Sequence, residues 1–230
     1  TLDASQRAAS QQARAAACRR VGRSEEAAAG FEQALALSRG IGDRSREANV
    51  LGSLGNLRRD QGRMDHARAH LESSLAIARE VGNRRLQGNL IGNLGVLHAV
   101  QGRLEEARSH FERALTIHSE VGNRRIEGID TSNLGNVCRE QGRLVEAGAH
   151  YQQALAIHRE VGNRRDEGIV IGNLGLLCGD QGRLDEARER CEGALAIGRE
   201  VGDRVFEGVI LGALSNVLRE QGRMEEALVH

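Results

Sequence analysis

A tripeptide that returns at a fixed interval is the feature that most constrains this chain. Gln-Gly-Arg recurs every 40 residues, with Val21-Gly22-Arg23 as an imperfect sixth copy: Gln61, Gln101, Gln141, Gln181 and Gln221. A second marker, Gly-Asn/Asp-Arg, recurs in phase at Gly42, Gly82, Gly122, Gly162 and Gly202. A period between about 20 and 50 residues is typical of a solenoid. Such proteins act through one extended surface, so the repeat predicts protein binding without naming the partner.

Each repeat is predicted to fold as two helices. In the unit 88–127, small or apolar residues follow the i, i+3, i+4, i+7 pattern of an amphipathic helix: Ile91, Leu94, Gly95 and His98. We expect this helix to begin near Asn83, a favourable N-cap, and to stop at Gly102. The same periodicity predicts a second helix from about Leu104 to Gly122. The unit is therefore a helical hairpin, repeated about six times.

Glycine is unusually frequent inside these helices, as at Gly88, Gly92, Gly95, Gly168, Gly172 and Gly175. Each glycine costs about 1 kcal/mol relative to alanine in a helix interior, so a geometric reason is expected. For Gly95 and its equivalents we predict close approach of two helices. For Gly92, Gly172 and Gly212, both helix packing and clearance for a bound peptide stay open.

The units resemble the tetratricopeptide repeat family. That family has Leu-Gly in the first helix, then a small residue, a large apolar residue and Ala in the second. The matching sets are Leu94-Gly95, Ala107, Phe111, Ala114; Leu134-Gly135, Ala147, Tyr151, Ala154; Leu174-Gly175, Ala187, Cys191, Ala194; and, more loosely, Leu54-Gly55, Ala67, Leu71, Ser74. The family period is about 34 residues, so longer helices and a longer loop at Gly-Asn-Arg-Arg are expected here. The 40-residue form is similar to Pins/LGN-type adaptors and to repeat arrays of bacterial signalling proteins.

The resemblance implies an all-α, right-handed superhelical solenoid of antiparallel helix hairpins spanning residues 1–230, with eleven or twelve helices. The expected units are 8–47, 48–87, 88–127, 128–167, 168–207 and a truncated 208–230. The first unit is degenerate because Arg14 and Ala15 replace Leu-Gly. Because the last unit stops at His230 within its second helix, we interpret the chain as a fragment of a longer array. End-to-end self-association through this C-terminus is a further expectation.

Composition narrows the classes of partner. Lys plus Arg and Asp plus Glu both total 32, aromatic residues make up 2%, and there is no Trp. The chain therefore lacks the basic excess and the stacking residues typical of a nucleic-acid surface. No apolar run approaches the roughly 18–20 residues of a membrane span. We expect neither nucleic acid nor a membrane as a partner.

The four cysteines are predicted to be small apolar core residues. Cys18, Cys138 and Cys178 occupy one position of the repeat, and Cys191 takes the place of Phe111 or Tyr151. No Cys-x-x-Cys pair predicts a zinc site or a disulfide framework. Reduced, buried thiols indicate a cytoplasmic protein, and the near-identical units rich in Arg, Gly and Ala suggest a bacterial source.

The resemblance places the binding surface on the first helices of successive hairpins, which line the concave face. The candidate groove residues are Asn56, Asn89, Asn93, Asn133, Asn136, Asn173 and Asn216, with Arg59, Arg139 and Arg219. Asparagine offers donors and an acceptor, so a row of it can pair with the backbone of an extended peptide. The alternative is that some of these side chains only bridge adjacent helices.

A second repeated set forms a candidate anion-contact edge: Arg84, Arg85, Arg124, Arg125, Arg164 and Arg165. Guanidinium groups bind carboxylates or phosphates as forks. The alternative is that these side chains pair with neighbouring acids such as Glu127 and Glu167.

No catalytic, cofactor or metal motif is present in the sequence. The histidines at 70, 110, 150 and 230, and at 118 and 158, belong to successive hairpins and lack short ligand spacing. We therefore predict no enzyme activity, no cofactor and no metal, and a protein-interaction scaffold that holds an extended peptide or a partner domain. The alternatives are a sensor or autoregulatory segment of a larger bacterial kinase, ATPase or transcription regulator, and a self-assembling structural array.

Overall fold

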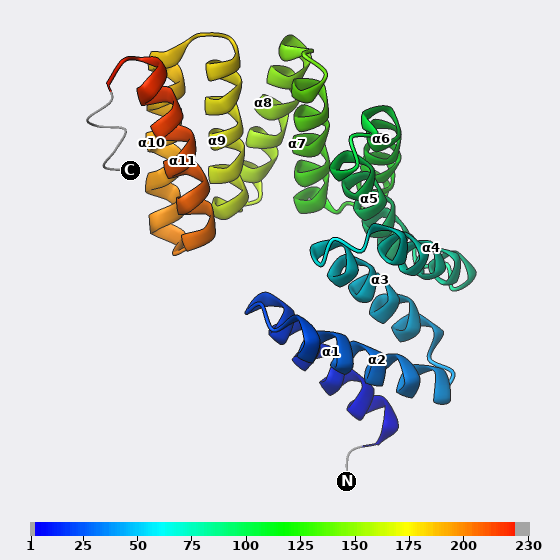
Figure 1. Ribbon diagram of the computed structural model, residues 1–230. Helices are drawn as coiled ribbons and strands as arrows, with labels where there is room; N and C mark the ends of the chain where they lie inside the picture. Colours follow the sequence, from blue (N-terminus) through cyan, green and yellow to red (C-terminus); the bar gives the residue numbers. More distant parts are fainter. Residues whose placement is uncertain (1–2, 224–230) are drawn as a thin grey trace. The chain divides into compact units, whose positions relative to one another are not determined.

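The computed structural model describes residues 3–223, which form eleven α-helices and no strand (Figure 1). The helices are α1 (Ala4–Arg20), α2 (Ser24–Gly40), α3 (Arg44–Asp60), α4 (Met64–Glu80), α5 (Arg84–Val100), α6 (Leu104–Glu120), α7 (Arg124–Glu140), α8 (Leu144–Glu160), α9 (Arg164–Asp180), α10 (Leu184–Val201) and α11 (Arg204–Glu220). The all-α class is confirmed. The second helix expected in the last unit, and His230 with the self-association assigned to it, lie outside the described residues.

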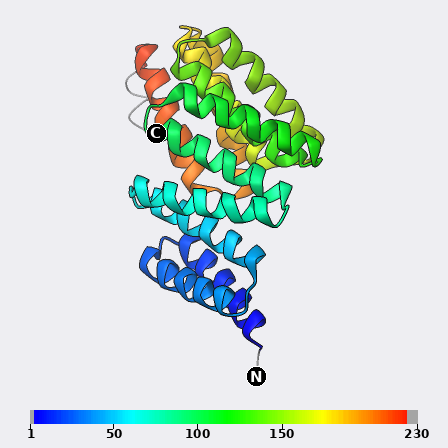
Figure 2. The ribbon, with the colours of Figure 1, turned by 90° about the vertical axis from the view of Figure 1, so that its right-hand side faces the viewer.

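The chain divides into two compact units, Thr1–Val121 and Gly122–His230. The first contains α1 to α6 and the second α7 to α11. Within each unit an odd-numbered helix packs most closely on the even-numbered helix that follows it, and the resulting hairpin packs on the next helix along the chain. Figures 1 and 2 show the two helices of a hairpin running side by side. The predicted repeat of antiparallel hairpins is confirmed in both units.

The connections between helices are three residues long, except that between α10 and α11, which has only Gly202 and Asp203. Each contains a glycine with φ between 65° and 77°, and this glycine recurs every twenty residues from Gly22 to Gly222. After α4, the amide of Gly82 donates to the carbonyl of Arg79 (3.1 Å) and that of Asn83 to Ala78 (2.9 Å). Asn83 is also the N-cap of α5, because its side chain accepts from the amide of Leu86 at 3.0 Å. One short turn thus ends one helix and begins the next.

The two kinds of connection differ only in how the following helix begins. Odd-numbered helices follow Asp or Asn, and in α5 the Asn83 side chain caps the first turn. Even-numbered helices follow Arg and lack a side-chain cap. In α6, Glu105 and Glu106 lie in the first turn instead, where they interact favourably with the helix dipole.

The predicted bounds of the hairpin 83–122 are confirmed, but the predicted longer loop at Gly-Asn-Arg-Arg is wrong. Arg84 and Arg85 are the first residues of α5, and both connections of the hairpin are three residues long. The additional residues of the 40-residue repeat therefore lie in the helices, ten of which have 17 residues and α10 has 18.

The hairpins are held together by glycine in one helix and a large side chain in the other. A Cβ placed on Gly95 would lie 2.8 Å from a ring carbon of Phe111, and one on Gly135 would lie 2.6 Å from the Tyr151 ring. The corresponding neighbour is Leu71 for Gly55. The prediction of close helix approach at Gly95 and its equivalents is confirmed.

The remaining helix glycines have several neighbours. Gly128 faces His158, and a Cβ there would lie 2.7 Å from the ring; Gly88 faces His118 at the same distance. Gly172 lies against Ile210, with a Cβ distance of 2.6 Å, which favours packing over ligand clearance at that position. A Cβ on Gly212 would meet nothing within 4 Å.

We expect Gly135→Ala to destabilise the fold by about 1–3 kcal/mol, because the new methyl group would overlap the buried Tyr151 ring. The matched control is Gly193→Ala in α10, where an added Cβ meets nothing within 4 Å. This control should gain up to about 1 kcal/mol from the better helix propensity of alanine. Urea titrations followed by circular dichroism measure both changes, and equal midpoints for the two variants would contradict the interlocking role of Gly135.

Candidate functional site

The predicted groove residues lie on the odd-numbered helices, along a half-buried stripe on each unit. Asn56 and Arg59 are on α3, Asn89 and Asn93 on α5, Asn133, Asn136 and Arg139 on α7, Asn173 on α9, and Asn216 and Arg219 on α11. All are partly exposed except Asn216 and Arg219, which are exposed. The helical spacing places them on the solvent-facing side of helices whose opposite side is packed in the core. The structure thus leaves these side chains accessible.

Two of these asparagines bridge the helices of their own hairpin. The Oδ1 atom of Asn89 lies 3.1 Å from Nε2 of His118, which is buried in α6. Asn136 accepts a hydrogen bond of 2.7 Å from the hydroxyl of Tyr151 in α8. Burial raises the pKa of Tyr151 to about 12, so the hydroxyl keeps its proton. Asn89 and Asn136 therefore have a structural role that the alternative reading of the sequence anticipated.

Other asparagines of the stripe are not used in this way. Among the described residues, Asn93 and Asn133 make no side-chain hydrogen bond. Asn173 donates to the hydroxyl of Ser132 at 3.5 Å, the upper limit for such a bond. The Oδ1 atom of Asn56 is buried and has no partner within the described part of the chain. The amides of Asn93, Asn133 and Asn173 therefore retain most of their capacity to bind a ligand.

Ion pairs lie at the end of the stripe formed by the C-terminal ends of the odd-numbered helices. Arg139 on α7 lies 3.2 Å from Asp180 on α9, and Arg19 on α1 lies 2.6 Å from Asp60 on α3. Asp60 also pairs with Arg59 at 3.1 Å. The acids thus neutralise most of the positive charge that Arg59 and Arg139 would offer a partner.

The first arginine of each predicted anion-contact pair belongs to a network of ion pairs. Arg124 lies 2.7 Å from Glu127 and 2.6 Å from Glu160. Arg164 lies 3.0 Å from Glu167 and 2.9 Å from Glu200. Arg84 pairs with Glu120 in the same manner. Each of these arginines joins the start of an odd-numbered helix to the end of the even-numbered helix that follows it.

The second arginines differ from one another. Arg165 lies 2.6 Å from Asp203, and Arg125 is 3.9 Å from Asp166. Arg85 makes no ion pair with any residue in 3–223. Most of the positive charge of the proposed anion-contact edge is therefore neutralised by acids of the protein itself. Of its six arginines, Arg85 alone lacks an ion pair within residues 3–223.

A set of buried carboxylates was not recognised from the sequence. Glu47 is 5% exposed and lies between Arg39 (2.8 Å) and Arg44 (2.7 Å). Burial opposes ionisation of Glu47, but hydrogen bonds from Arg39 and Arg44 outweigh it, and its pKa is lowered. The same balance lowers the pKa of Glu167 between Arg159 and Arg164. The indication in the sequence was the in-phase recurrence of Glu at a position that the helical pattern places in the interior.

The buried histidines and cysteines have roles in packing. His118 and His158 are almost fully buried, and burial lowers the pKa of His158. Cys138, Cys178 and Cys191 are buried as predicted, and burial raises the pKa of the Cys191 thiol to about 11. Cys18 is only half-buried, which corrects its assignment to the core. The reason is a hollow beside it in the degenerate first hairpin.

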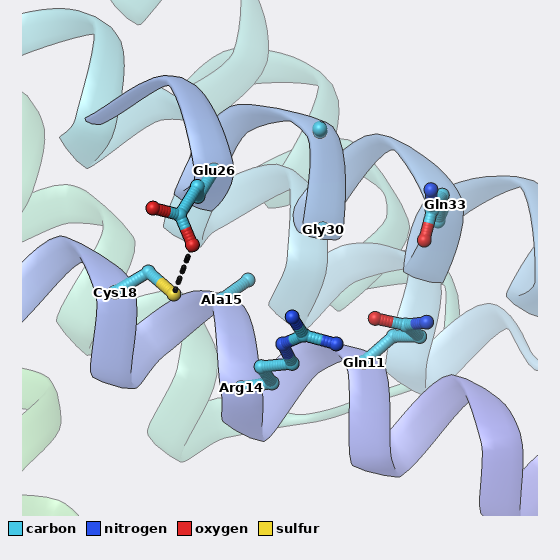
Figure 3. A pocket seen from close by; sticks show the side chains of 8 residues that line it. Gln11, Arg14, Ala15, Cys18, Glu26, Gly30 and Gln33 are labelled. Atoms are coloured by element: carbon cyan, nitrogen blue, oxygen red, sulfur yellow. Dashed lines mark hydrogen bonds between the residues drawn. The ribbon is translucent and has the colours of Figure 1, made fainter. Parts of the chain in front are cut away.

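That hollow, of about 200 Å³, lies between α1 and α2. Figure 3 shows Gln11, Arg14 and Cys18 of α1 facing Glu26 and Gln33 of α2 across it. It exists because Gly30 stands where later hairpins have the larger residues His70, His110, His150 and Arg190. Gly30 instead admits Ala15, whose Cβ would be 2.9 Å from an added Cβ. The contact of Cys18 with Glu26, 3.9 Å, is the only hydrogen bond drawn in the figure.

No group of three or more potential metal ligands occurs within residues 3–223. None of the helices in this part of the chain combines the length and the apolar character needed to cross a membrane.

Comparison with known proteins identifies the repeat. The sequence model of the tetratricopeptide repeat matches residues 6–80, 84–160, 129–190 and 166–230. No curated protein sequence matches significantly. Among solved structures, the apo form of RapI superimposes with a TM-score of 0.81 at 14% identity, covering 99% of this chain and 81% of that one.

Two further structures are similar in fold. A Rap protein complexed with Competence and Sporulation Factor has a TM-score of 0.72 at 14% identity, covering 97% of this chain and 67% of that chain. A signal transduction ATPase with numerous domains and a tetratricopeptide repeat sensor, from Pyrococcus horikoshii, has a TM-score of 0.74 at 15% identity. The superposition covers 99% of this chain but only 36% of the ATPase chain. At these identities the likeness concerns the fold alone.

The buried carboxylates generate a prediction about acid stability. Because the folded-state pKa of Glu47 and Glu167 is lowered from 4.5, their stabilising effect is present above that pH and is lost as the pH falls towards the lowered value. We expect the double variant Glu47→Gln, Glu167→Gln to melt at a lower temperature than the parent at neutral pH. The difference should shrink as the pH falls below 4.5.

Thermal melts followed by circular dichroism across this pH range measure the effect. Glu112→Gln is the control, because Glu112 is exposed and pairs with Arg108 on the surface of α6. A constant difference between the double variant and the parent at every pH would contradict the ionised state of the buried carboxylates.

Proposed function

Because this chain belongs to the tetratricopeptide repeat family, we propose that it is a non-catalytic interaction scaffold that holds an extended peptide on the stripe of its odd-numbered helices. The observation that carries this proposal is the division of the stripe into two sets of asparagines. Asn89 and Asn136 are engaged with buried side chains. Asn93 and Asn133, one helical turn away, make no side-chain hydrogen bond among the described residues.

Unengaged amides suit the backbone of an extended partner. An asparagine side chain can donate to a peptide carbonyl and accept from a peptide amide at the same time. In the second unit, Asn133 and Asn173 occupy equivalent positions of α7 and α9, helices that are in contact. A ligand that crosses these helices would meet the same amide once per hairpin. Recognition of this kind depends on backbone geometry and tolerates different side chains.

The structural neighbours and the charges support the same proposal. A protein of similar fold, a Rap protein, is complexed with Competence and Sporulation Factor. The ion pairs of Arg139 with Asp180 and of Arg59 with Asp60 leave little net charge on the stripe. A partner of modest charge is therefore expected, with an affinity that depends weakly on salt.

We expect Asn133→Ala, Asn173→Ala to weaken peptide binding by about 1 kcal/mol for each lost hydrogen bond, and to leave the melting temperature nearly unchanged. The measurement uses peptides selected from a displayed random library on the immobilised chain, followed by calorimetric titration of the parent and the variant.

Asn136→Ala is the matched control on the same stripe. It removes the partner of the buried Tyr151 hydroxyl, so it should lower the melting temperature and leave binding by the folded protein unchanged. If the double variant melts far below the parent yet binds the peptides normally, the stripe is structural and the proposal is wrong.

A second candidate function is a sensor or autoregulatory segment of a larger signalling protein. It is favoured by the similarity to the Pyrococcus horikoshii ATPase, in which the tetratricopeptide repeats are a sensor and of which this chain spans 36%. The full-length gene distinguishes the candidates. An ATPase, kinase or DNA-binding domain encoded in the same reading frame would favour the sensor, whereas a gene that encodes repeats alone would favour the scaffold. Under either candidate function, we propose that the protein is cytoplasmic and of bacterial origin.

A further inference from the structure

A pocket of about 290 Å³ lies in the first unit between α4, α5 and α6. Its rim carries three arginines: Arg79 at the end of α4, Arg84 at the start of α5 and Arg113 on α6. Its walls include the buried side chains of Gln87, Ile91 and Ile117. No acidic residue lines it. The pocket therefore combines a cationic mouth with an apolar wall.

The other hairpin junctions show what is missing here. At residues 47 and 167 the equivalent of Gln87 is a buried glutamate that accepts hydrogen bonds from two arginines. Glu47 lies between Arg39 and Arg44, and Glu167 lies between Arg159 and Arg164 at 2.9 and 3.0 Å. Glu127 and Glu207 occupy the same position in α7 and α11. This junction alone, of the five that the repeat places at residues 47, 87, 127, 167 and 207, has a neutral side chain.

Gln87 does not replace the missing charge. Its amide nitrogen donates to the carbonyl of Ala78 at 3.0 Å, and its oxygen accepts a bond of 3.3 Å from Arg84. Arg79, the equivalent of Arg39 and Arg159, makes no ion pair within residues 3–223. An arginine that binds an internal carboxylate at two other junctions, through Arg39 and Arg159, is thus left with its guanidinium group available.

A second difference adds charge at the same place. Arg113 occupies a position where the other hairpins have Gln33, Ser73, Gln153 and Gly193. It also makes no ion pair in the part of the chain that the structure describes. Of the three rim arginines only Arg84 is neutralised, by Glu120. Compared with the other repeats, the repeat around this pocket therefore has one acidic residue fewer, at position 87, and one basic residue more, at position 113.

We propose that this pocket binds a carboxylate carried on a short aliphatic stem. Arg79 and Arg113 form charge-assisted hydrogen bonds with the carboxylate oxygens, as Arg39 and Arg44 do with Glu47. The methylene groups of the stem pack on Ile91 and Ile117, which are 4% and 6% exposed. The volume suits a glutamate side chain or a small free dicarboxylate and is below that of a typical drug-sized ligand site.

The site is separate from the asparagine stripe. It is formed at the ends of α4 and α6 and the beginning of α5, and it requires no residue of the proposed peptide surface. The two sources of a carboxylate, a free dicarboxylate and an acidic residue of a protein partner, share the same recognition chemistry, and titration with one probe of each kind distinguishes them.

The test is calorimetric titration of the whole chain with glutarate, with an N-acetylated, C-amidated Gly-Glu-Gly peptide and with inorganic phosphate. We expect saturable binding of glutarate, of the peptide, or of both. Gln87→Glu should weaken it about tenfold or more, because the new internal carboxylate occupies Arg79 and Arg84. Arg113→Gln should weaken it by a similar factor.

Both variants introduce residues that other units of this chain already hold at the same position, so they are compatible with the fold, and circular dichroism melts verify this. Arg23→Gln, which removes a charge from an exposed site in the same unit, should leave the affinity unchanged. Binding of glutarate alone identifies a free ligand, and binding of the peptide alone identifies a protein partner. Absence of binding for both probes, a Gln87→Glu variant with unchanged affinity, or phosphate bound more tightly than either carboxylate would overturn the proposal.

Discussion

The close contact between a glycine of one helix and a large side chain of the other determines how the polar side chains of each hairpin are positioned. Gly135 leaves no room for a methyl group beside Tyr151, and Gly95 none beside Phe111. Because the two helices approach this closely, polar groups on the neighbouring turns also meet. Asn136 reaches the Tyr151 hydroxyl, whereas Asn133, one turn earlier and also half-buried, makes no side-chain hydrogen bond among the described residues. The packing of the hairpin thus decides which asparagine is structural and which is accessible.

The second constraint is the short turn that joins the helices. Asn83 ends the hydrogen-bonding pattern of α4 and caps α5 within a three-residue connection, the form found at all but one of the helix connections. A connection this short brings the end of an even-numbered helix next to the start of the following odd-numbered one. Arg39 of α2 and Arg44 of α3 consequently converge on the buried Glu47. The ion pairs at the junctions follow from the turn geometry, and they explain why most arginines of the proposed anion-contact edge are already paired.

Because the ion pair recurs at other junctions, the junction that lacks its glutamate differs from them in surface chemistry. An arginine that lacks a carboxylate partner keeps its charge and its hydrogen-bonding capacity. The replacement of glutamate by Gln87 leaves Arg79 in that state, and Arg113 adds a further cation beside it. Because the other junctions keep the glutamate, the difference changes the surface chemistry of one unit without changing the fold. A repeat array can in this way acquire a specific site at one position.

The sequence by itself determined the hairpin, its bounds near Asn83, Gly102 and Leu104, and the close approach at Gly95, because these depend on local capping, helical periodicity and a position where only glycine fits. It did not determine the length of the loop before Arg84, because the added residues of the longer period extend the helices and this is decided by packing along their whole length. Nor could it separate Asn136 from Asn133, or recognise Glu47 as a buried carboxylate.

These distinctions depend on contacts between helices that are remote in the sequence. An asparagine at a helix surface has the same local pattern whether a tyrosine hydroxyl of the next helix reaches it or not. A glutamate in a helix is ordinarily exposed, and only the convergence of Arg39 and Arg44 from two helices compensates its burial. The tertiary structure therefore decided which polar side chains stabilise the protein and which are available to a partner, because burial and hydrogen bonding are properties of the packed helices and not of the repeat that encodes them.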